Sequence, residues 1–231
     1  HMRPWYEDPD SEPLSTPTGK IEFYSTALAE HYPDDVERPP VPHFVPYGES
    51  HSEGLLHPRA KEYPFLLITN HPRWRVHANN DDNTWMREFE TCKVKGPDGY
   101  LHEPIWVNSL DAGRLNPHDG DICKIFNERG AALGGVRPSE RVIPGALYQD
   151  HGSRVDSIVI GEFDRGGANN PICPSNTPSK NCPGAVTNSF FINIAKVAVL
   201  ELAKQYPVEF AKFYDKDTGQ EAQTCTIKEG G

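Results

Sequence analysis

The sequence is poor in apolar residues. Only 36% of its 231 residues are hydrophobic, and the mean hydropathy is −0.63, whereas a self-contained globular domain typically has close to half, glycine included. No apolar run approaches the roughly 20 residues that a membrane span requires, so we expect neither a membrane span nor a signal peptide. The 19 glycines and 22 prolines instead indicate a β-rich body with long surface segments, or a piece of a larger structure.

Positive charge is also scarce, and the usual nucleotide-binding motifs are missing. Lysine and arginine total 23 against 33 acidic residues, which gives a net charge of −10. Nucleic-acid binders normally carry a basic stripe, so we expect no nucleic-acid partner. The sequence contains neither Gly-x-Gly-x-x-Gly nor a Walker phosphate loop, which argues against the common dinucleotide and nucleoside-triphosphate folds.

Cysteines and histidines do not stand at metal-ligand spacings. The five cysteines form no Cys-x-x-Cys pair, and their odd number argues against a complete disulfide framework, so we expect isolated thiols. Cys173 and Cys182 are nine residues apart without a matching second pair. His71 and His77 are six residues apart, a step that fits neither the helical i,i+4 pattern nor His-x-His on a strand. The spacing therefore predicts no protein metal site.

Composition divides the chain into three parts. Proline, acidic and aromatic residues dominate positions 1–57, so we expect an extended arm that leads from a preceding domain, with one short helix at 22–31. His1-Met2 has the form of a tag-cleavage scar. Residues 58–197 carry the pattern of a β-rich domain. We expect helices at 194–205 and 207–214 around the start of the last part, 198–231, which ends in a polar tail.

Short apolar runs, spaced roughly ten residues apart, predict the strands of the β-rich domain. We expect strands at 63–69, 105–108, 122–127, 131–136, 142–148 and 185–194, and a short helix at 110–115 with Ser109 as its N-cap. Glycine turns at 119–121 and 128–130 join neighbouring strands. Strands this short, with few helices between them, are typical of a small closed barrel.

The segment 69–80, directly after the first strand, carries many hydrogen-bond donors. It contains a threonine, three asparagines, two arginines and two histidines. A donor-rich turn after a strand suits a phosphate, and guanidinium groups match phosphate oxygens bidentately. A solvated surface loop with an ordinary charge cluster accounts for the same residues, so the pattern leaves both interpretations open.

Three further polar segments follow strands. Asn108 and Asp111 place an amide and a carboxylate at a strand-to-helix turn, where they could accept the donor edge of a guanine or simply favour the helix N-terminus. Residues 150–153 read Asp-His-Gly-Ser, but adjacent residues cannot face each other as a catalytic triad requires, and the Gly-x-Ser-x-Gly elbow is absent. The amide-rich stretches 166–170 and 179–182 favour hydrogen-bond recognition over acid–base catalysis.

Taken in order, these segments resemble the C-terminal domain of the dimethyl sulfoxide reductase family of molybdopterin enzymes. The matching series comprises residues 17–25, 69–80, 105–112, 119–121, 129–130, 144–145, 150–152 and 170–184. The resemblance implies a mainly β fold, a six-stranded double-psi β-barrel with short peripheral helices and an extended N-terminal arm. It also implies a cofactor, bis-molybdopterin guanine dinucleotide with molybdenum or tungsten, that is complete only in the full-length enzyme.

The resemblance further implies that certain residues bind this cofactor, and that none in this chain is catalytic or a metal ligand. The cofactor-binding residues of the first loop would be Thr69, Asn70, His71, Arg75 and His77. The guanine would be bound by Asn108 and Asp111. The pterin side would be lined by His151, Asn170, Lys180 and Asn181. The chain alone is therefore expected to be inactive.

Within the family, residues 70–79, 164–169 and 179–182 look closest to the branch of pyrogallol–phloroglucinol transhydroxylase and the catechol dehydroxylases. That likeness implies hydroxyl transfer or reductive dehydroxylation of polyphenols in anaerobic metabolism. Many family members have Asp-Pro near position 181, where this sequence has Asn181-Cys182-Pro183. The departure puts a formate dehydrogenase or nitrate reductase assignment in doubt.

The resemblance implies as partners the preceding domains of the same enzyme and an iron–sulfur electron-transfer subunit. The expected compartment is the cytoplasm, or the destination of a holoenzyme exported in the folded state. A function of another class stays open from the sequence: a free-standing double-psi barrel that acts as an interaction or small-ligand module.

Overall fold

The structure, a computed structural model, describes residues 2–45, 52–54, 56–81, 83–87, 89, 92–175, 179–181 and 189–210. The chain divides into two compact units. The first unit comprises His1–Ser52 together with Thr177–Ala185, and the second comprises Glu53–Asn176 together with Val186–Gly231.

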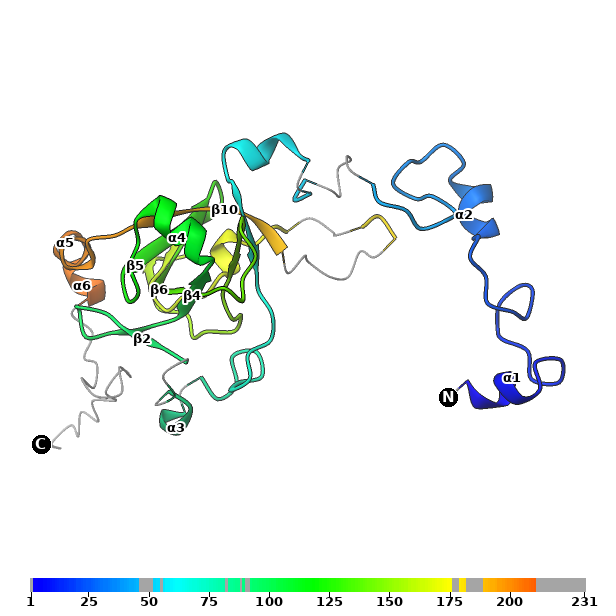
Figure 1. The fold of residues 1–231 in the computed structure, drawn as a ribbon, viewed down its shortest axis with the longest axis horizontal. Helices are drawn as coiled ribbons and strands as arrows, with labels where there is room; N and C mark the ends of the chain where they lie inside the picture. Colours follow the sequence, from blue (N-terminus) through cyan, green and yellow to red (C-terminus); the bar gives the residue numbers. More distant parts are fainter. Residues whose placement is uncertain are drawn as a thin grey trace, which may run out of the picture. The chain divides into compact units, whose positions relative to one another are not determined.

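The second unit is built on a closed barrel of six strands (Figure 1). The strands follow the order β4–β7–β1–β10–β5–β6, and β6 pairs back with β4 to close the barrel. They span Phe65–Ile68 (β1), Pro104–Val107 (β4), Ile122–Asn127 (β5), Gly130–Pro138 (β6), Ala146–Tyr148 (β7) and Ser189–Lys196 (β10). The pairs β1–β7 and β4–β6 are parallel, and the other four are antiparallel. The predicted mainly β fold with a closed six-stranded barrel is confirmed.

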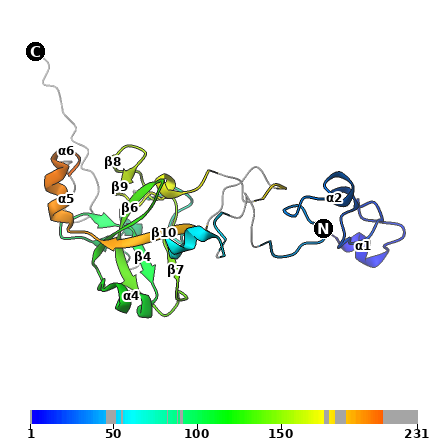
Figure 2. The ribbon, with the colours of Figure 1, turned by 90° about the horizontal axis from the view of Figure 1, so that it is seen from above.

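Shorter elements decorate this barrel. The two-residue strands β2 and β3 pair with each other, and β9 extends the sheet from β6 to β8. These elements span Val94–Lys95 (β2), Leu101–His102 (β3), Ser157–Val159 (β8) and Phe163–Asp164 (β9). The helices are Thr84–Arg87 (α3), Ser109–Leu115 (α4), Val199–Gln205 (α5) and Pro207–Phe210 (α6), with 3-10 turns at Pro58–Lys61 and Asn170–Ile172. Figure 2 shows α5 and α6, in orange, together at one end of the barrel.

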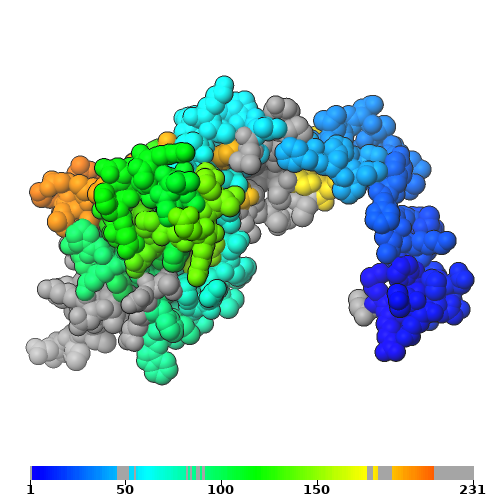
Figure 3. Space-filling view, viewed as in Figure 1, coloured from blue at the N-terminus to red at the C-terminus, as the bar shows by residue number. Residues whose placement is uncertain are grey.

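Alternating apolar side chains fill the barrel. In β5, Ile125 points inward with no exposed surface, as do Leu67 of β1 and Ile105 of β4, all within one continuous core cluster. A Cβ at Gly134 would lie 2.5 Å from Cγ1 of Ile105, so glycine is required where β6 pairs with β4. A second cluster, which includes Val199 of α5, attaches the last helices. In Figure 3 the green segments that carry α4, β5 and β6 form one continuous surface.

Several sequence-based boundaries differ from the structure. Helix α4 is capped by Asn108, whose Oδ1 accepts a hydrogen bond from the Leu110 amide at 2.9 Å, and not by Ser109. The last strand continues to Lys196 and α5 begins at Val199, because Ile194 is needed in the barrel core. The predicted strand residues 185–188 and helix residues 211–214 lie outside the described residues.

The first unit contains two short helices, Arg3–Glu7 (α1) and Thr26–His31 (α2). Only a helix near α2 was predicted; α1 forms with proline in its first turn, where proline is tolerated. Lys180 belongs to this unit and forms ion pairs with Asp35 at 3.3 Å and Glu37 at 3.4 Å. In neither unit do the described residues form a helix long and apolar enough to span a membrane.

Candidate functional site

Two polar loops leave the same edge of the barrel. The segment 69–80 follows β1 and the segment 149–154 follows β7, and these two strands are parallel neighbours. The ladder continues past the strand ends, since the Gln149 amide donates to the Ile68 carbonyl at 3.1 Å and the His151 amide to the Asn70 carbonyl at 3.2 Å. Strand pairing therefore brings residues separated by about 80 positions into one site.

Three imidazoles meet where these loops touch. Nε2 of His71 lies 3.3 Å from Nε2 of His77, and Nε2 of His151 lies 3.1 Å from Nδ1 of His77. Nδ1 of His151 contacts the Thr69 carbonyl at 3.1 Å, which fixes this ring with its proton on Nδ1. Partial desolvation and the two neighbouring imidazoles lower the pKa of His71. The three rings form a close cluster of imidazole nitrogens.

Backbone geometry places His77 in this cluster. Its φ angle is +52°, a left-handed conformation that residues with a side chain seldom adopt. Gly152 packs directly against it, so that a Cβ at Gly152 would lie 2.1 Å from the His77 carbonyl oxygen. With a φ angle of +81°, position 152 suits glycine on both counts.

A buried ion-pair cluster supports the loops from below. Arg75 contacts Glu103 at 2.8 Å and Asp81 at 2.9 Å, and Lys93 bonds to the same two carboxylates. All four side chains are at most 4% exposed. Burial would raise the pKa of Asp81, but the charges of Lys93 and Arg75 outweigh it and lower the pKa to about 2. Two cations and two anions thus balance inside the protein.

This cluster determines what Arg75 can contact. Its guanidinium also donates to the carbonyl oxygens of Asp150 at 3.2 Å and His151 at 3.0 Å. Each of its three nitrogens therefore has a protein acceptor. In this arrangement Arg75 holds the loop 149–154 in place, and Thr69, 4% exposed, holds His151 through its backbone.

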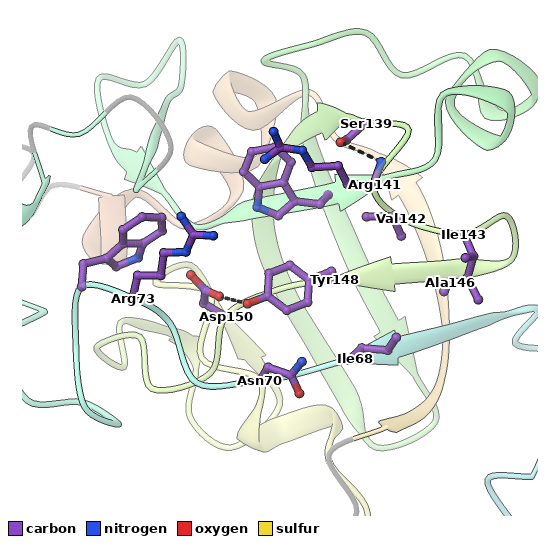
Figure 4. A pocket seen from close by; sticks show the side chains of 12 residues that line it. Ile68, Asn70, Arg73, Ser139, Arg141, Val142, Ile143, Ala146, Tyr148 and Asp150 are labelled. Atoms are coloured by element: carbon purple, nitrogen blue, oxygen red, sulfur yellow. Dashed lines mark hydrogen bonds between the residues drawn. The ribbon is translucent and has the colours of Figure 1, made fainter.

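A cavity of about 470 Å³ lies between the loop 69–80 and the segment 139–146 (Figure 4), and its lining includes Asn70 and Asp150, the sequence neighbours of His71 and His151. Its polar and aromatic lining consists of Asn70, Arg73, Trp74, Trp106, Ser139, Arg141, Tyr148 and Asp150. Figure 4 shows Arg73 and Arg141 on different chain segments, flanking the Tyr148–Asp150 pair. Both guanidinium groups are without a hydrogen bond or ion pair within the part of the chain that the structure describes. The cavity thus combines two available cations with aromatic faces.

Tyr148 and Asp150 form a hydrogen-bonded pair on the cavity wall. Burial and the Asp150 carboxylate raise the pKa of Tyr148, and burial raises the pKa of Asp150. Tyr148 therefore keeps its proton at neutral pH, and its hydroxyl donates a hydrogen bond to the Asp150 carboxylate.

Asn108 and Asp111 lie behind the cavity, with 4% and 5% of their surfaces exposed. Nδ2 of Asn108 donates to the Val142 carbonyl at 2.6 Å, and Oδ2 of Asp111 accepts from the Gly145 amide at 2.7 Å. Both side chains thereby fix the segment 142–145, and Val142 lines the cavity. The structure brings these two residues to the cavity, where they shape its wall.

The remaining sequence-predicted residues are more scattered. Asn170 is exposed at the start of a 3-10 turn in the second unit. Lys180 and Asn181 belong to the first unit; Asn181 lines a separate cavity there, between residues 16–45 and 179–181. The structure thus unites Asn70, His71, Arg75, His77 and His151 in one site, with Asn108 and Asp111 behind it.

The sequence interpretation missed most of the cavity lining. Arg73 and Trp74 were within the segment singled out, but Trp106, Arg141 and Tyr148 were not identified as site residues. Trp106 pairs with Tyr148 across strands β4 and β7, a register that only the closed barrel establishes. The spacing argument against a metal site considered His71 and His77 alone. It did not include the third imidazole, His151, which is 74 residues from His77 in the sequence.

Known proteins with similar sequences are large enzymes. The chain is 32% identical over 173 residues to trimethylamine-N-oxide reductase 1 of Escherichia coli K12, covering 75% of this chain and 18% of that protein. It is 31% identical over 190 residues to the pyrogallol hydroxytransferase large subunit of Pelobacter acidigallici, covering 79% and 21%. The dimethyl sulfoxide reductase DmsA of E. coli K12 is 30% identical over 196 residues, covering 83% and 22%. The chain thus spans about a fifth of the length of these relatives.

The fold is also found in a solved enzyme structure. Acetylene hydratase from Pelobacter acetylenicus superposes with a TM-score of 0.56 at 16% identity, covering 82% of this chain and 25% of the hydratase. The family model described as "Molydopterin dinucleotide binding domain" matches residues 65–189, which include five of the six barrel strands, the histidine cluster and the cavity. This match covers more than half of the sequence, so the chain belongs to the molybdopterin dinucleotide-binding domain family.

Proposed function

We propose that the chain binds the guanylate, pyrophosphate and pterin parts of bis-molybdopterin guanine dinucleotide, as the C-terminal domain of a molybdenum or tungsten oxidoreductase. The observation that carries the proposal is the cavity with two available guanidinium groups, Arg73 and Arg141, beside aromatic faces. Guanidinium groups pair bidentately with phosphate oxygens, and aromatic rings offer a face for a heterocycle. The donor set therefore suits an anionic dinucleotide.

Each part of the site has a task in this proposal. Arg73, Arg141 and Asn70 hold the pyrophosphate and its neighbouring groups. The imidazoles of His71, His77 and His151 contact the pterin, because imidazole nitrogens can donate or accept hydrogen bonds. When bound, the cofactor supplies the metal-centred redox or hydroxyl-transfer chemistry. The chain's own residues bind and orient it, and none is assigned a catalytic role.

Arg75, Asn108 and Asp111 act within this proposal by positioning the walls. Arg75 fixes the carbonyl of His151, and the other two fix the segment 142–145. Any contact of Asn108 and Asp111 with a guanine would require their protein hydrogen bonds to be exchanged. Asn170, Lys180 and Asn181 remain candidates for the pterin side in the complete enzyme, and Thr69 remains a candidate in the first cofactor-binding loop.

We further propose that the whole enzyme acts on polyphenols, by hydroxyl transfer or reductive dehydroxylation. The likeness of residues 70–79, 164–169 and 179–182 to the polyphenol-transforming branch supports this substrate class, and so does the 31% identity to the pyrogallol hydroxytransferase large subunit. The preceding domains of the enzyme and an iron–sulfur subunit are its proposed partners. Exposed apolar side chains of the second unit, such as Ile143 at 71% and Ile160 at 92% exposure, offer surface for such contacts.

Calorimetric titration with GDP tests the binding proposal. We expect saturable binding, a preference for GDP over ADP, and a loss of about tenfold or more in Arg141→Ala, since a hydrogen bond to a charged group contributes about 1.5–3 kcal/mol. Arg3→Ala is the matched control, because this arginine is 81% exposed in α1 and does not line the cavity. Equal affinity for both nucleotides, with an unaffected Arg141 variant, would favour an interaction module instead.

The substrate proposal is tested on the full-length enzyme. Activity with a catechol or pyrogallol substrate, and none with trimethylamine N-oxide or dimethyl sulfoxide, is the expected result. The reverse preference would contradict the polyphenol assignment and leave the binding proposal intact.

A further inference from the structure

We infer that His71, His77 and His151 form a binding site for one divalent transition-metal ion, with zinc as the expected occupant. Among the described residues these three side chains form a group in which one nitrogen of each ring can be chosen so that all lie within 4.8 Å of one another. The site uses only residues of this chain.

The spacing of the nitrogens suits coordination. With bonds of about 2.0–2.1 Å and a tetrahedral angle, two imidazole nitrogens on one zinc ion stand about 3.3 Å apart. Nε2 of His71 and Nε2 of His77 are 3.3 Å apart. The third ring, His151, has its centroid 4.3 Å from that of His71 and 5.1 Å from that of His77. His71 and His77 are exposed, so small ring rotations can bring all three nitrogens to one point.

The contact with the Thr69 carbonyl orients the His151 ring as a metal ligand. Its Nδ1 faces the Thr69 carbonyl at 3.1 Å, and its Nε2 lies 3.1 Å from Nδ1 of His77. Metal-binding histidines usually donate their second N–H to a carbonyl or carboxylate, which fixes the ring and raises its basicity. The Thr69 contact supplies this support before any ion arrives.

The charge of the arginine that contacts the His151 backbone is neutralised locally. Arg75 lies against the backbone of His151, but its charge is balanced by Glu103 and Asp81. The Asp150 carboxylate stands next to His151 in sequence and is 4% exposed. Three imidazoles and an open fourth position accessible to water match the donor type and number that zinc, nickel, cobalt and copper prefer, whereas magnesium and calcium require oxygen ligands.

Metal and cofactor would use the same imidazoles, because the proposed function assigns these rings to the pterin. The inference itself does not depend on that proposal, since it rests on the geometry of the three rings. An ion bound here in the cofactor-free chain would hold the loops 69–80 and 149–154 together, and cofactor loading would displace it.

The test is a titration of the chelator-treated 231-residue chain with Zn²⁺, followed by calorimetry, and with Co²⁺, followed by visible absorption. We expect one saturable site per chain and the absorption of four-coordinate cobalt with nitrogen ligands. His71→Ala should weaken zinc binding at least about tenfold, the scale on which even outer-shell changes act. His118→Ala is the matched control and should bind as the unmodified chain does, because its side chain is 76% exposed and distant in sequence from all three ligands.

Two results would overturn the inference: no saturable one-to-one binding, or the same zinc affinity in His71→Ala as in the unmodified chain. His151→Gln provides a second, independent variant. GDP titration of the same samples separates this inference from the proposed function, because guanidinium-dependent nucleotide binding requires no zinc. If the unmodified chain binds GDP but shows no zinc binding, the metal site alone is refuted.

Discussion

Replacing Glu103 with glutamine removes one charge from the buried cluster beneath the site. Glu103 is fully buried and contacts both cations, Arg75 and Lys93. The substitution keeps the shape of the side chain but leaves two buried cations with Asp81 as their one carboxylate partner within the cluster. Removing one partner of a buried pair costs about 3–5 kcal/mol, because the remaining charge is uncompensated.

For a chain of this size, each kcal/mol shifts the melting temperature by about 2–4 °C. We therefore expect Glu103→Gln to melt about 6–20 °C lower, as followed by circular dichroism and by urea denaturation. The control Asp119→Asn breaks an ion pair whose carboxylate side chain is 60% exposed, and it should cost less than about 1 kcal/mol.

A compensating variant tests the cause of the loss. Combining Glu103→Gln with Lys93→Met restores the balance of charge, so the double variant should be more stable than Glu103→Gln alone. If Glu103→Gln were as harmless as Asp119→Asn, the reasoning that the cluster's charges compensate one another would be refuted.

Three other positions give sharp predictions. Burial raises the pKa of Asp164 to about 6, so the native state binds this proton more tightly than the unfolded chain, and stability falls as the pH rises from about 4 to about 6. Relative to Asp164→Asn, the unmodified chain should lose about 3 kcal/mol of unfolding free energy between pH 4 and 7, as measured by urea titrations. Parallel pH profiles of the two proteins would contradict this. Gly152→Ala should lower the stability to thermal unfolding by at least about 2 kcal/mol and weaken zinc binding, because its Cβ would meet the His77 carbonyl. The control Gly145→Ala has a similar φ angle but no atom within 4 Å of its Cβ, so it should cost about 1 kcal/mol. The buried Cys123 thiol, whose pKa burial raises to about 12, should resist alkylation at pH 8 in the native chain and react once the chain is unfolded; rapid native labelling would count against its burial.

The barrel strands were predictable because their signals are local. The runs that became β1, β4 and β5 combine continuous or alternating apolar residues with turns on either side, and the turn at Gly130 joins β5 to β6. By contrast, β2 and β3 contain two residues each. Such short strands exist only through tertiary pairing, which no local pattern reveals.

The site was predictable only where it follows a strand directly. Asn70, His71 and His77 stand in the loop after β1, where the structure brings the two histidines together, and the cofactor-binding role that the resemblance implies for them stays a prediction. The burial of Arg75 was not foreseeable, because charged side chains are mostly exposed unless they are paired. Its partner Glu103 lies 28 residues away. Long-range pairing of this kind is settled by strand order and not by sequence spacing.

The parallel pairing of β1 and β7 has a consequence for how such domains diversify. The loops 69–80 and 149–154 start from the same rim of a closed barrel whose strands are held by backbone hydrogen bonds. Their length and side chains can therefore be exchanged without changing the register of the barrel. Transplanting the segments 69–80 and 149–154 as a matched set onto the barrel of a relative would carry the binding preference with them, whereas moving one segment alone would separate the halves of the histidine cluster.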